Sequence, residues 1–433
     1  MIEKPPAIKQ TDPSRILDIL LNPDYEDAFS KIENDYLYWT KAKYYCPNSI
    51  QPEDFWAAIR FKRRLSMQRI LFGKYVFFFN LTDYMQQLLH EFDMRFGGSL
   101  SSENLISDKS RQYFLISSLM EEAIASSQME GALTTRKDAK SMLRKQLKPK
   151  DKSQQMILNN YNTIRFLSDH KEEKLSRELI LEVHKMISGK TLERESDEGK
   201  FRSDDSIVVS NGITGEIAHE PPSFIAIEGM IQQICDFANS PKPFIHPIIK
   251  AIIIHFMISF LHPFVDGNGR TARSLFYWYM LKNGYWLTEF LSISRIIYRS
   301  KSQYENAFIY SEQDDLDLGY FIHYNMTVLD KAYSELTHYL ERKSKEENAV
   351  LKYRNIPGIN ERQARVLKFY SEKPDSIVVS KELESLLNVS VKTIRSDLEG
   401  LVKLHLLDRI PLNRRLMGYA LSKDAGKMLA CSN

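Results

Sequence analysis

Apolar residues recur at three- and four-residue intervals along most of this chain, which is the spacing of an amphipathic helix. One short stretch differs: residues 206–210 are rich in β-branched side chains, and the turn-forming pairs Asn211-Gly212 and Thr214-Gly215 separate them from residues 216–219. Helices are predicted in the ranges 25–96, 105–131, 153–169, 176–188, 223–239, 244–261, 274–281 and 318–345. The pattern therefore predicts a mainly α-helical fold with one small β-hairpin.

The pattern changes after residue 348. A charged stretch, residues 341–348, ends the long helix predicted at 318–345 and is interpreted as a linker. Beyond it, three short helices are predicted at 361–370, 379–387 and 390–401, followed by two strands between residues 404 and 421. Two short helices that meet at a serine cap and precede a two-stranded wing are typical of a winged helix-turn-helix domain.

The net positive charge of the chain lies in this C-terminal part. Of the chain's 59 basic and 56 acidic residues, 13 and 9 lie in residues 360–433, which gives a net charge of +4 there. The candidate DNA contacts are Lys392, Thr393, Arg395, Arg414 and Arg415. Asp397 and Glu399, on the same predicted helix, would repel phosphates if they faced the DNA groove. Protein docking or dimerisation is the alternative role of such a domain.

The overall composition is that of a globular protein, with 43% hydrophobic and 27% charged residues. The formal net charge of +3 is too small to indicate nucleic-acid binding by the whole chain. The three cysteines have neither zinc-site nor disulfide spacing, so a reducing cytoplasm is the expected location. No signal-peptide pattern follows Met1, and the longest apolar run, residues 251–264, is too short to cross a membrane.

Residues 262–273 read HPFVDGNGRTAR and lie between two apolar helices. Gly267 and Gly269 leave room for backbone N–H groups to close around an anion. A helix that starts between these glycines would direct its unpaired N–H groups and positive dipole end at the same anion. Arg270 and Arg273 could both reach phosphate oxygens from its first turn.

Two further side chains of this stretch indicate a reaction rather than binding alone. His262 could take a proton from an attacking hydroxyl. Asp266 offers a hard oxygen ligand to a Mg²⁺ ion that keeps most of its waters and bridges phosphates. Together with the anion site, they predict transfer of part of a nucleotide polyphosphate. The alternative is a tight interhelical turn with a buried histidine and two surface arginines.

The same twelve residues match the signature HPFx[DE]GNGRxxR at every fixed position, and the chain closely resembles Fic-domain proteins over roughly residues 105–315. The resemblance implies a Fic-type helical core that transfers AMP from ATP to a Ser, Thr or Tyr hydroxyl of a protein target, including itself. It implies that His262 deprotonates the hydroxyl and that Asp266 holds Mg²⁺ on the phosphates. The ATP-binding residues that it implies are Gly267, Asn268, Gly269, Arg270 and Arg273, with the Asn268 side chain stabilising the developing charge.

A second resemblance lies at the end of the predicted helix at about 113–131. Glu130 stands near the C-terminal end of that helix, where the dipole disfavours a carboxylate, so an arginine partner is expected. Ser126, Glu130 and Gly131 match the [ST]xxxE[GN] inhibitory motif of many Fic proteins. The resemblance implies that Glu130 pairs with Arg273 and blocks it from the γ-phosphate. An exposed glutamate at a helix end is the alternative.

The predicted hairpin, at about 205–220, resembles the flap that holds target segments in Fic proteins by main-chain hydrogen bonds. The implied target contacts are Ile207, Val208 and Val209, and an ordinary surface hairpin is the alternative. Tyr304 is the implied contact to the nucleotide base. Gln303 stands where the family usually carries a second tyrosine, so the base preference stays open.

The sequence divides the chain into a helical N-terminal region (1–104), a Fic core (105–348) and a winged-helix-like domain (349–433). The expected function is AMPylation of a protein hydroxyl, autoinhibited by Glu130. The alternatives are removal of AMP, transfer of UMP or phosphocholine, and a nucleotide-responsive, DNA-binding transcriptional regulator. No membrane association is expected. The target protein, the trigger and the oligomeric state, including a homodimer, stay open.

Overall fold

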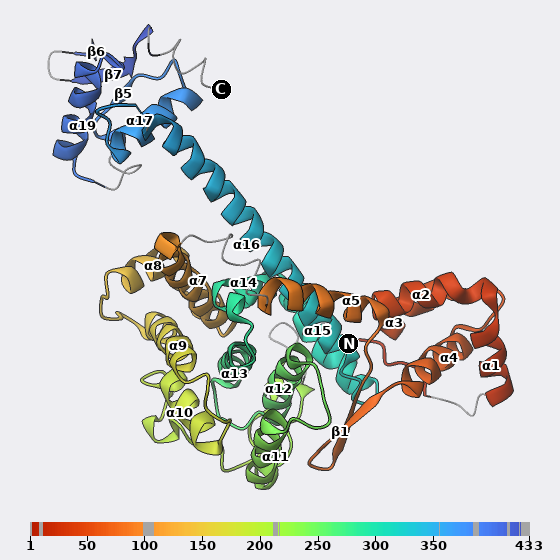
Figure 1. Ribbon diagram of the computed structural model, residues 1–433. Helices are drawn as coiled ribbons and strands as arrows, with labels where there is room; N and C mark the ends of the chain where they lie inside the picture. Colours follow the sequence, from red (N-terminus) through yellow and green to blue (C-terminus); the bar gives the residue numbers. More distant parts are fainter. Residues whose placement is uncertain are drawn as a thin grey trace. The chain divides into compact units, whose positions relative to one another are not determined.

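A computed structural model describes residues 2–7, 12–97, 108–210, 215, 217–354, 356–383, 389–413, 416–423 and 425. The fold is mainly α-helical, as the sequence predicted, and the chain forms two compact units, residues 1–336 and 337–433 (Figure 1).

Helix α16, Gly319–Arg354, runs from the first unit into the second. It continues through the charged stretch 341–348, which the sequence suggested as a linker. That stretch contains no glycine or proline and is rich in Glu, Lys and Arg, which are good helix formers. The stretch is therefore helical and the predicted boundary between residues 348 and 349 lies inside a helix, while its interpretation as a linker stays a prediction.

The N-terminal part of the first unit is helical apart from one hairpin. Its helices and helical turns are α1 Pro13–Leu21, η1 Pro23–Tyr25, α2 Glu26–Asn34, α3 Trp39–Ala42, η2 Lys43–Tyr45, α4 Pro52–Leu65, α5 Asp83–Phe92 and η3 Asp93–Gly97. The hairpin pairs β1, Gln68–Phe72, antiparallel with β2, Tyr75–Phe79.

This hairpin corrects the prediction of an unbroken helical pattern over residues 25–96. Ile70 and Phe72 in β1, and Phe77 and Phe79 in β2, are buried at every second position, which is the period of a strand. Phe72 and Phe77 pack on the core helix α12, where their ring centroids lie 6.5 and 5.3 Å from that of Phe260. The strand period was present in the sequence but was overlooked beside the helical pattern on either side.

Helices α12 (Pro247–Leu261) and α13 (Asn268–Lys282) form the centre of the first unit, and nearly all of their side chains are buried. The elements that surround them are α7 Asp108–Met129, α8 Arg136–Arg144, α9 Lys152–Asp169, α10 Arg177–Ser188, η4 Glu195–Asp197, η5 Phe224–Ala226, α11 Ile227–Asn239, η6 Trp286–Phe290, α14 Ile293–Arg299 and α15 Lys301–Gln313. The predicted helices at 153–169, 176–188 and 223–239 are confirmed within four residues at each end. None of the helices in the described ranges is long and apolar enough to cross a membrane.

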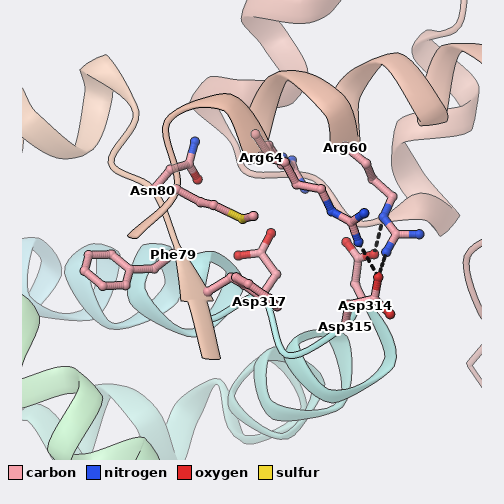
Figure 2. Close-up of a pocket in the computed structure, with 10 residues that line it drawn as sticks. Arg60, Arg64, Phe79, Asn80, Asp314, Asp315 and Asp317 are labelled. Atoms are coloured by element: carbon pink, nitrogen blue, oxygen red, sulfur yellow. Dashed lines mark hydrogen bonds and ion pairs between the residues drawn. The ribbon is translucent and has the colours of Figure 1, made fainter. Parts of the chain in front are cut away.

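The turn between α15 and α16 connects to the N-terminal helices through ion pairs (Figure 2). Arg60 of α4 lies with its Nε 3.0 Å from Oδ1 of Asp314, and both Arg60 and Arg64 contact Asp315. Asp317 lies in the same turn, and burial raises the pKa of its carboxyl to about 6. These residues line a cavity of about 20 Å³, roughly the space that one water molecule needs.

The predicted hairpin after residue 205 is present, although its paired part is short. Strand β3, Val209–Ser210, pairs antiparallel with β4, Ile217–His219, and Val209 lies opposite His219. The tip of the predicted flap, residues 211–214 and 216, lies outside the described residues.

The second unit contains α17 Glu361–Glu372, β5 Val378–Val379, α19 Val391–Lys403, β6 Leu407–Pro411 and β7 Met417–Leu421. The strands form one antiparallel sheet in the order β5-β7-β6. The sequence predicted the two strands β6 and β7, and β5 pairs with β7 as a third strand that was not predicted. Ile394, Leu398 and Leu401 of α19 are buried against Tyr370 and Tyr419. Part of the predicted helix 379–387 lies outside the described residues, and the winged-helix interpretation stays a prediction.

Candidate active site

The turn between α12 and α13 carries His262. This residue ends α12 in the left-handed backbone region, with φ 47° and ψ 57°, and its ring is half-buried. Nδ1 lies 3.3 Å from the carbonyl oxygen of Ser259. A carbonyl only accepts hydrogen bonds, so Nδ1 carries the proton and Nε2 keeps its lone pair. Burial lowers the pKa of His262 to about 4, so its ring is neutral at pH 7 and able to take a proton.

Asn268 makes contacts that the sequence did not predict. Its Oδ1 accepts a hydrogen bond from the backbone N–H of Phe264 at 2.9 Å, and its Nδ2 donates to the carbonyl of the same residue at 2.8 Å. Both ends of the buried amide are therefore used to close the loop between α12 and α13. The side chain thus shapes the loop, and its expected contact with a phosphate, for which the second N–H of Nδ2 is left, stays a prediction.

Replacing Asn268 with alanine is expected to destabilise the chain by about 2–4 kcal/mol, because two hydrogen bonds are lost and two buried backbone groups are left unpaired. Chemical denaturation of the full chain would measure the change. Asn283→Ala is the matched control, because that side chain donates to the Tyr279 carbonyl at 2.8 Å at the other end of α13, away from the loop. Equal losses in the two variants would contradict this account of Asn268.

His184 of α10 holds the same loop from outside and was missed by sequence reasoning. Its ring stacks on Phe264 with a centroid distance of 3.7 Å and an interplanar angle of 1°. Nδ1 accepts a hydrogen bond from the N–H of Gly199 at 3.1 Å, so the proton is on Nε2, which donates to the carbonyl of Asp266 at 2.9 Å. Burial lowers the pKa of His184 to about 4, which keeps this arrangement neutral. The residue lies inside an ordinary amphipathic helix, and nothing in the sequence around it indicated a contact to the loop.

Arg270 is fully buried behind the loop. Its Nη1 donates to the Ile187 carbonyl at 3.2 Å, whereas Nε and Nη2 have no hydrogen-bond partner among the described residues. The nearest carboxylate oxygen, Oδ1 of Asp266, is 3.5 Å from Nη2. Burial lowers the pKa of this guanidinium. Buried N–H groups without partners are costly, so this side chain fits a bound anion that would accept from them.

Arg273 is also buried, but in contrast to Arg270 its Nε and Nη2 both have hydrogen-bond acceptors. Nε donates to the Ser126 hydroxyl at 2.9 Å, and Nη2 donates to the Ser126 carbonyl at 3.0 Å and to Oε1 of Glu130 at 2.8 Å. The two residues that the sequence singled out upstream therefore both contact the second arginine of the motif. They come from the end of α7, which is closed by Gly131 at a φ of 91°.

The Glu130 carboxylate lies at the start of α13. A Cβ atom built on Gly269 would collide with Oε1 of Glu130, so only glycine leaves room for the carboxylate there. Burial would raise the pKa of Glu130, but the charges of Arg273 and Arg270 outweigh it and hold that pKa below the usual value. The position at the first turn of α13 therefore already holds one anion, which the chain itself supplies.

Part of the chain is similar in sequence to known proteins. Residues 174–280 match the sequence profile of the Fic/DOC family. The chain contains a Fic domain. It is 32% identical over 116 residues to protein adenylyltransferase Fic of Nematostella vectensis and 30% identical over 127 residues to protein adenylyltransferase fic-1 of Caenorhabditis elegans. These matches cover 27% and 28% of this chain but 25% and 23% of the relatives, so the matched part spans about a quarter of their length.

A solved structure is similar in fold. The crystal structure of a Fic family protein from Desulfovibrio desulfuricans G20 aligns with a TM-score of 0.51 and 18% sequence identity. The alignment covers 79% of this chain and 97% of that one.

Asp266 is the metal ligand that the sequence predicted in the Fic domain. Its carboxylate is about half exposed, and one oxygen accepts from the N–H of Gly267. Among the described residues, no group of three or more His, Cys, Asp or Glu side chains comes together to hold a metal ion. A single open carboxylate beside an anion position fits Mg²⁺ that keeps its waters and shares a phosphate. The metal role stays a prediction.

Arg202 connects the β3–β4 hairpin, the predicted flap, to the turn that carries His262 and was missed by sequence reasoning. Its backbone N–H donates to the Pro263 carbonyl at 2.9 Å, and its Nε donates to the His262 carbonyl at 3.0 Å. Its Nη1 also donates to Oδ1 of Asp205 at 2.8 Å, and that carboxylate accepts from the N–H of Phe224 at 2.6 Å. These bonds hold together the segments that precede and follow the β3–β4 hairpin. An arginine shortly before two aspartates is too common a pattern to have indicated them.

The other predicted site residues are placed as follows. Tyr304 is buried in the core, with its hydroxyl 2.9 Å from Nε2 of His255, and its role as a base contact stays a prediction. Ile207 and Val208 precede β3 and Val209 begins it, with Val208 exposed. Lys392 and Arg395 are exposed on α19 and Thr393 is partly exposed. Arg414 and Arg415 lie outside the described residues.

Proposed function

We propose that this chain is a protein adenylyltransferase that transfers AMP from ATP to a hydroxyl of a protein, and that Glu130 holds it inactive. The observation that carries the proposal is the neutral His262 beside the two buried arginines at the start of α13. The Fic domain and the names of the curated relatives support it.

The chemistry follows from these positions. Nε2 of His262 accepts the proton of a Ser, Thr or Tyr hydroxyl, and the oxygen attacks the α-phosphate of ATP. The bond between the α- and β-phosphates breaks, and pyrophosphate leaves. Arg270 and Arg273 bind the phosphates, together with the first N–H groups of α13. Mg²⁺ held by Asp266 would neutralise phosphate charge when it is bound.

Inhibition follows from the same contacts. Glu130 accepts a hydrogen bond from the guanidinium that would bind a phosphate, and the negative carboxylate repels that phosphate. Arg273 therefore has to exchange one anion for another before the reaction. Release of the end of α7 would free it.

The group that is transferred can be identified by mass. The full-length Glu130→Gly variant would be incubated with a mixture of ATP, GTP, UTP and CDP-choline, and its intact mass measured. The addition of one AMP is the expected result. The addition of UMP or phosphocholine would contradict adenylyl transfer and identify another transferred group. Loss of AMP from a previously modified protein would favour removal of AMP over its transfer.

A second candidate function, DNA binding by the second unit, is favoured by one observation. Both acidic side chains of α19 face other residues of the unit: Asp397 is buried against Arg362 and Asn360, and Glu399 pairs with Arg409. The repulsion that the sequence suggested is therefore removed. Lys392, Arg395, Ser396 and Lys403 are the exposed side chains of the helix, and no acidic side chain is among them.

The full-length chain is accordingly expected to shift duplex DNA at low salt. Arg395→Ala should weaken binding and lower the dependence of the logarithm of the binding constant on log[salt] by about 1, because one phosphate contact is lost. Arg365→Ala on α17 is the matched control, because this exposed arginine pairs with Glu361. His262→Ala should bind DNA as the parent does. Equal effects of Arg395→Ala and Arg365→Ala would contradict DNA recognition by α19 and favour a protein-docking role.

A further inference from the structure

His219, the last residue of β4, lies between the flap and the end of α12. Its Nε2 is 2.7 Å from the carbonyl oxygen of Phe260, and its Nδ1 is 2.8 Å from Oε2 of Glu312 on α15. A carbonyl and a carboxylate both accept hydrogen bonds, so both ring nitrogens have to donate. The geometry is that of a charged imidazolium bonded on both sides, with a side chain only 9% exposed.

The surroundings favour this charge. Burial alone would lower the pKa of His219, but the hydrogen bond and charge of Glu312, the Phe260 carbonyl and the charge of Glu220 together raise it. Phe260 belongs to the last turn of α12, whose unpaired carbonyls form the negative end of the helix dipole. Among the described residues, His262 is a further titratable neighbour: burial is the main cause that lowers its pKa, and the charge of His219 adds to it.

The flap is thereby attached at both of its ends to the turn that carries His262. Arg202 binds the carbonyls of His262 and Pro263 on one side, and His219 binds the Phe260 carbonyl on the other. The first attachment uses an arginine, which stays charged at all accessible pH values. The second uses a histidine and is the one that can be lost.

We propose that His219 is a positioning residue whose bonds to Phe260 and Glu312 fix strand β4 beside His262 and so orient the protein hydroxyl that is to be modified. This role rests on the proposed adenylyl transfer. It assigns to His219 no contact with ATP and no proton transfer.

The attachment depends on pH in a defined direction. The pKa of His219 in the folded chain lies above its ordinary value of 6.5. The bonds are therefore complete below about pH 6.5 and are lost as the pH rises through the raised value, when one nitrogen gives up its proton. The flap should loosen at alkaline pH, while His262 stays neutral throughout that range.

Hydrogen exchange of the full-length chain tests this without any need for activity. Exchange in the segments 203–210 and 217–222 would be followed from about pH 6 to about pH 9, after correction for the intrinsic pH dependence of exchange. The parent should lose protection in these segments as the pH rises. In His219→Gln and Glu312→Gln, protection of these segments should already be lower than in the parent at low pH, by on the order of tenfold. The reason is that a charge-assisted hydrogen bond is missing.

Glu305→Gln is the matched control. This carboxylate also lies on α15, but it is exposed, and its ion pair with Lys301 is long, at 3.9 Å, and therefore weak. It should exchange like the parent. A second readout uses the Glu130→Gly background, where His219→Gln should slow self-modification about tenfold while leaving the KM for ATP unchanged. Flap protection in His219→Gln that equals the parent's at every pH would overturn the proposal. Absence of labelling in every variant, with the exchange pattern as expected, would instead contradict the proposed transferase and leave the attachment of the flap standing.

Discussion

Glu130→Gly is expected to raise self-modification with labelled ATP by on the order of 10- to 100-fold, the equivalent of one charge-assisted hydrogen bond of 1.5–3 kcal/mol. The wild-type chain should be nearly silent. The reason is the bond of 2.8 Å between Glu130 and Arg273, together with the carboxylate that fills the space over Gly269. Removal of that side chain frees both the guanidinium and the start of α13 for phosphates. Incorporation of label into the protein over time is the measurement.

The matched control is Glu121→Gln on the same helix. That carboxylate pairs with Arg136 and Lys140, so the variant should stay as silent as the wild type. Weak labelling that is equal in wild type and Glu130→Gly would contradict the inhibitory role of Glu130.

His262→Ala in the Glu130→Gly background is expected to lower the labelling rate by roughly 10²- to 10⁴-fold, the range for loss of a general base. Binding of ATP should change little, because no phosphate ligand is altered. The base form of His262 exists above its pKa of about 4, so protonation of His262 should lower the rate only as the pH approaches that value from above. A fall in rate at alkaline pH would come from His219 and the flap instead. Initial rates of labelling across pH, with the affinity for ATP measured separately, provide the test.

His338→Ala controls for the loss of a histidine elsewhere, since its side chain is 81% exposed on α16. This variant should label at the parental rate. Full activity of His262→Ala would mean that the proton goes elsewhere, and the proposed mechanism would then fail.

The parts of this site that could be predicted are those whose chemistry is fixed by local sequence. His262, the glycines and the two arginines follow one another within one turn and one helix start, so their proximity needs no knowledge of the fold. The partnership of Glu130 with Arg273 spans 143 positions and was reached only through a family motif. The mismatch of a carboxylate at a helix C-terminus indicated that a partner was needed, but not which one.

The remaining parts depend on tertiary packing. The contact of the Asn268 amide with the backbone of Phe264, four residues away, was not predicted, because that geometry exists only once the loop has formed. Arg202 and His184 contact the catalytic turn across 60 and 82 positions, through bonds to backbone atoms that carry no sequence signal. The β1–β2 hairpin was overlooked for a different reason, because its alternating pattern is only five residues long on each strand.

Glu130 also changes how ATP should act on the wild-type chain. A carboxylate built into the same polypeptide competes at an effective concentration of order millimolar, set by the geometry of α7 and not by the amount of protein present. Dilution therefore cannot relieve the block, in contrast to an inhibitor supplied by a second molecule. Nucleotide has to outcompete a ligand that never diffuses away, so the low wild-type rate should keep rising at ATP concentrations that already saturate the Glu130→Gly variant.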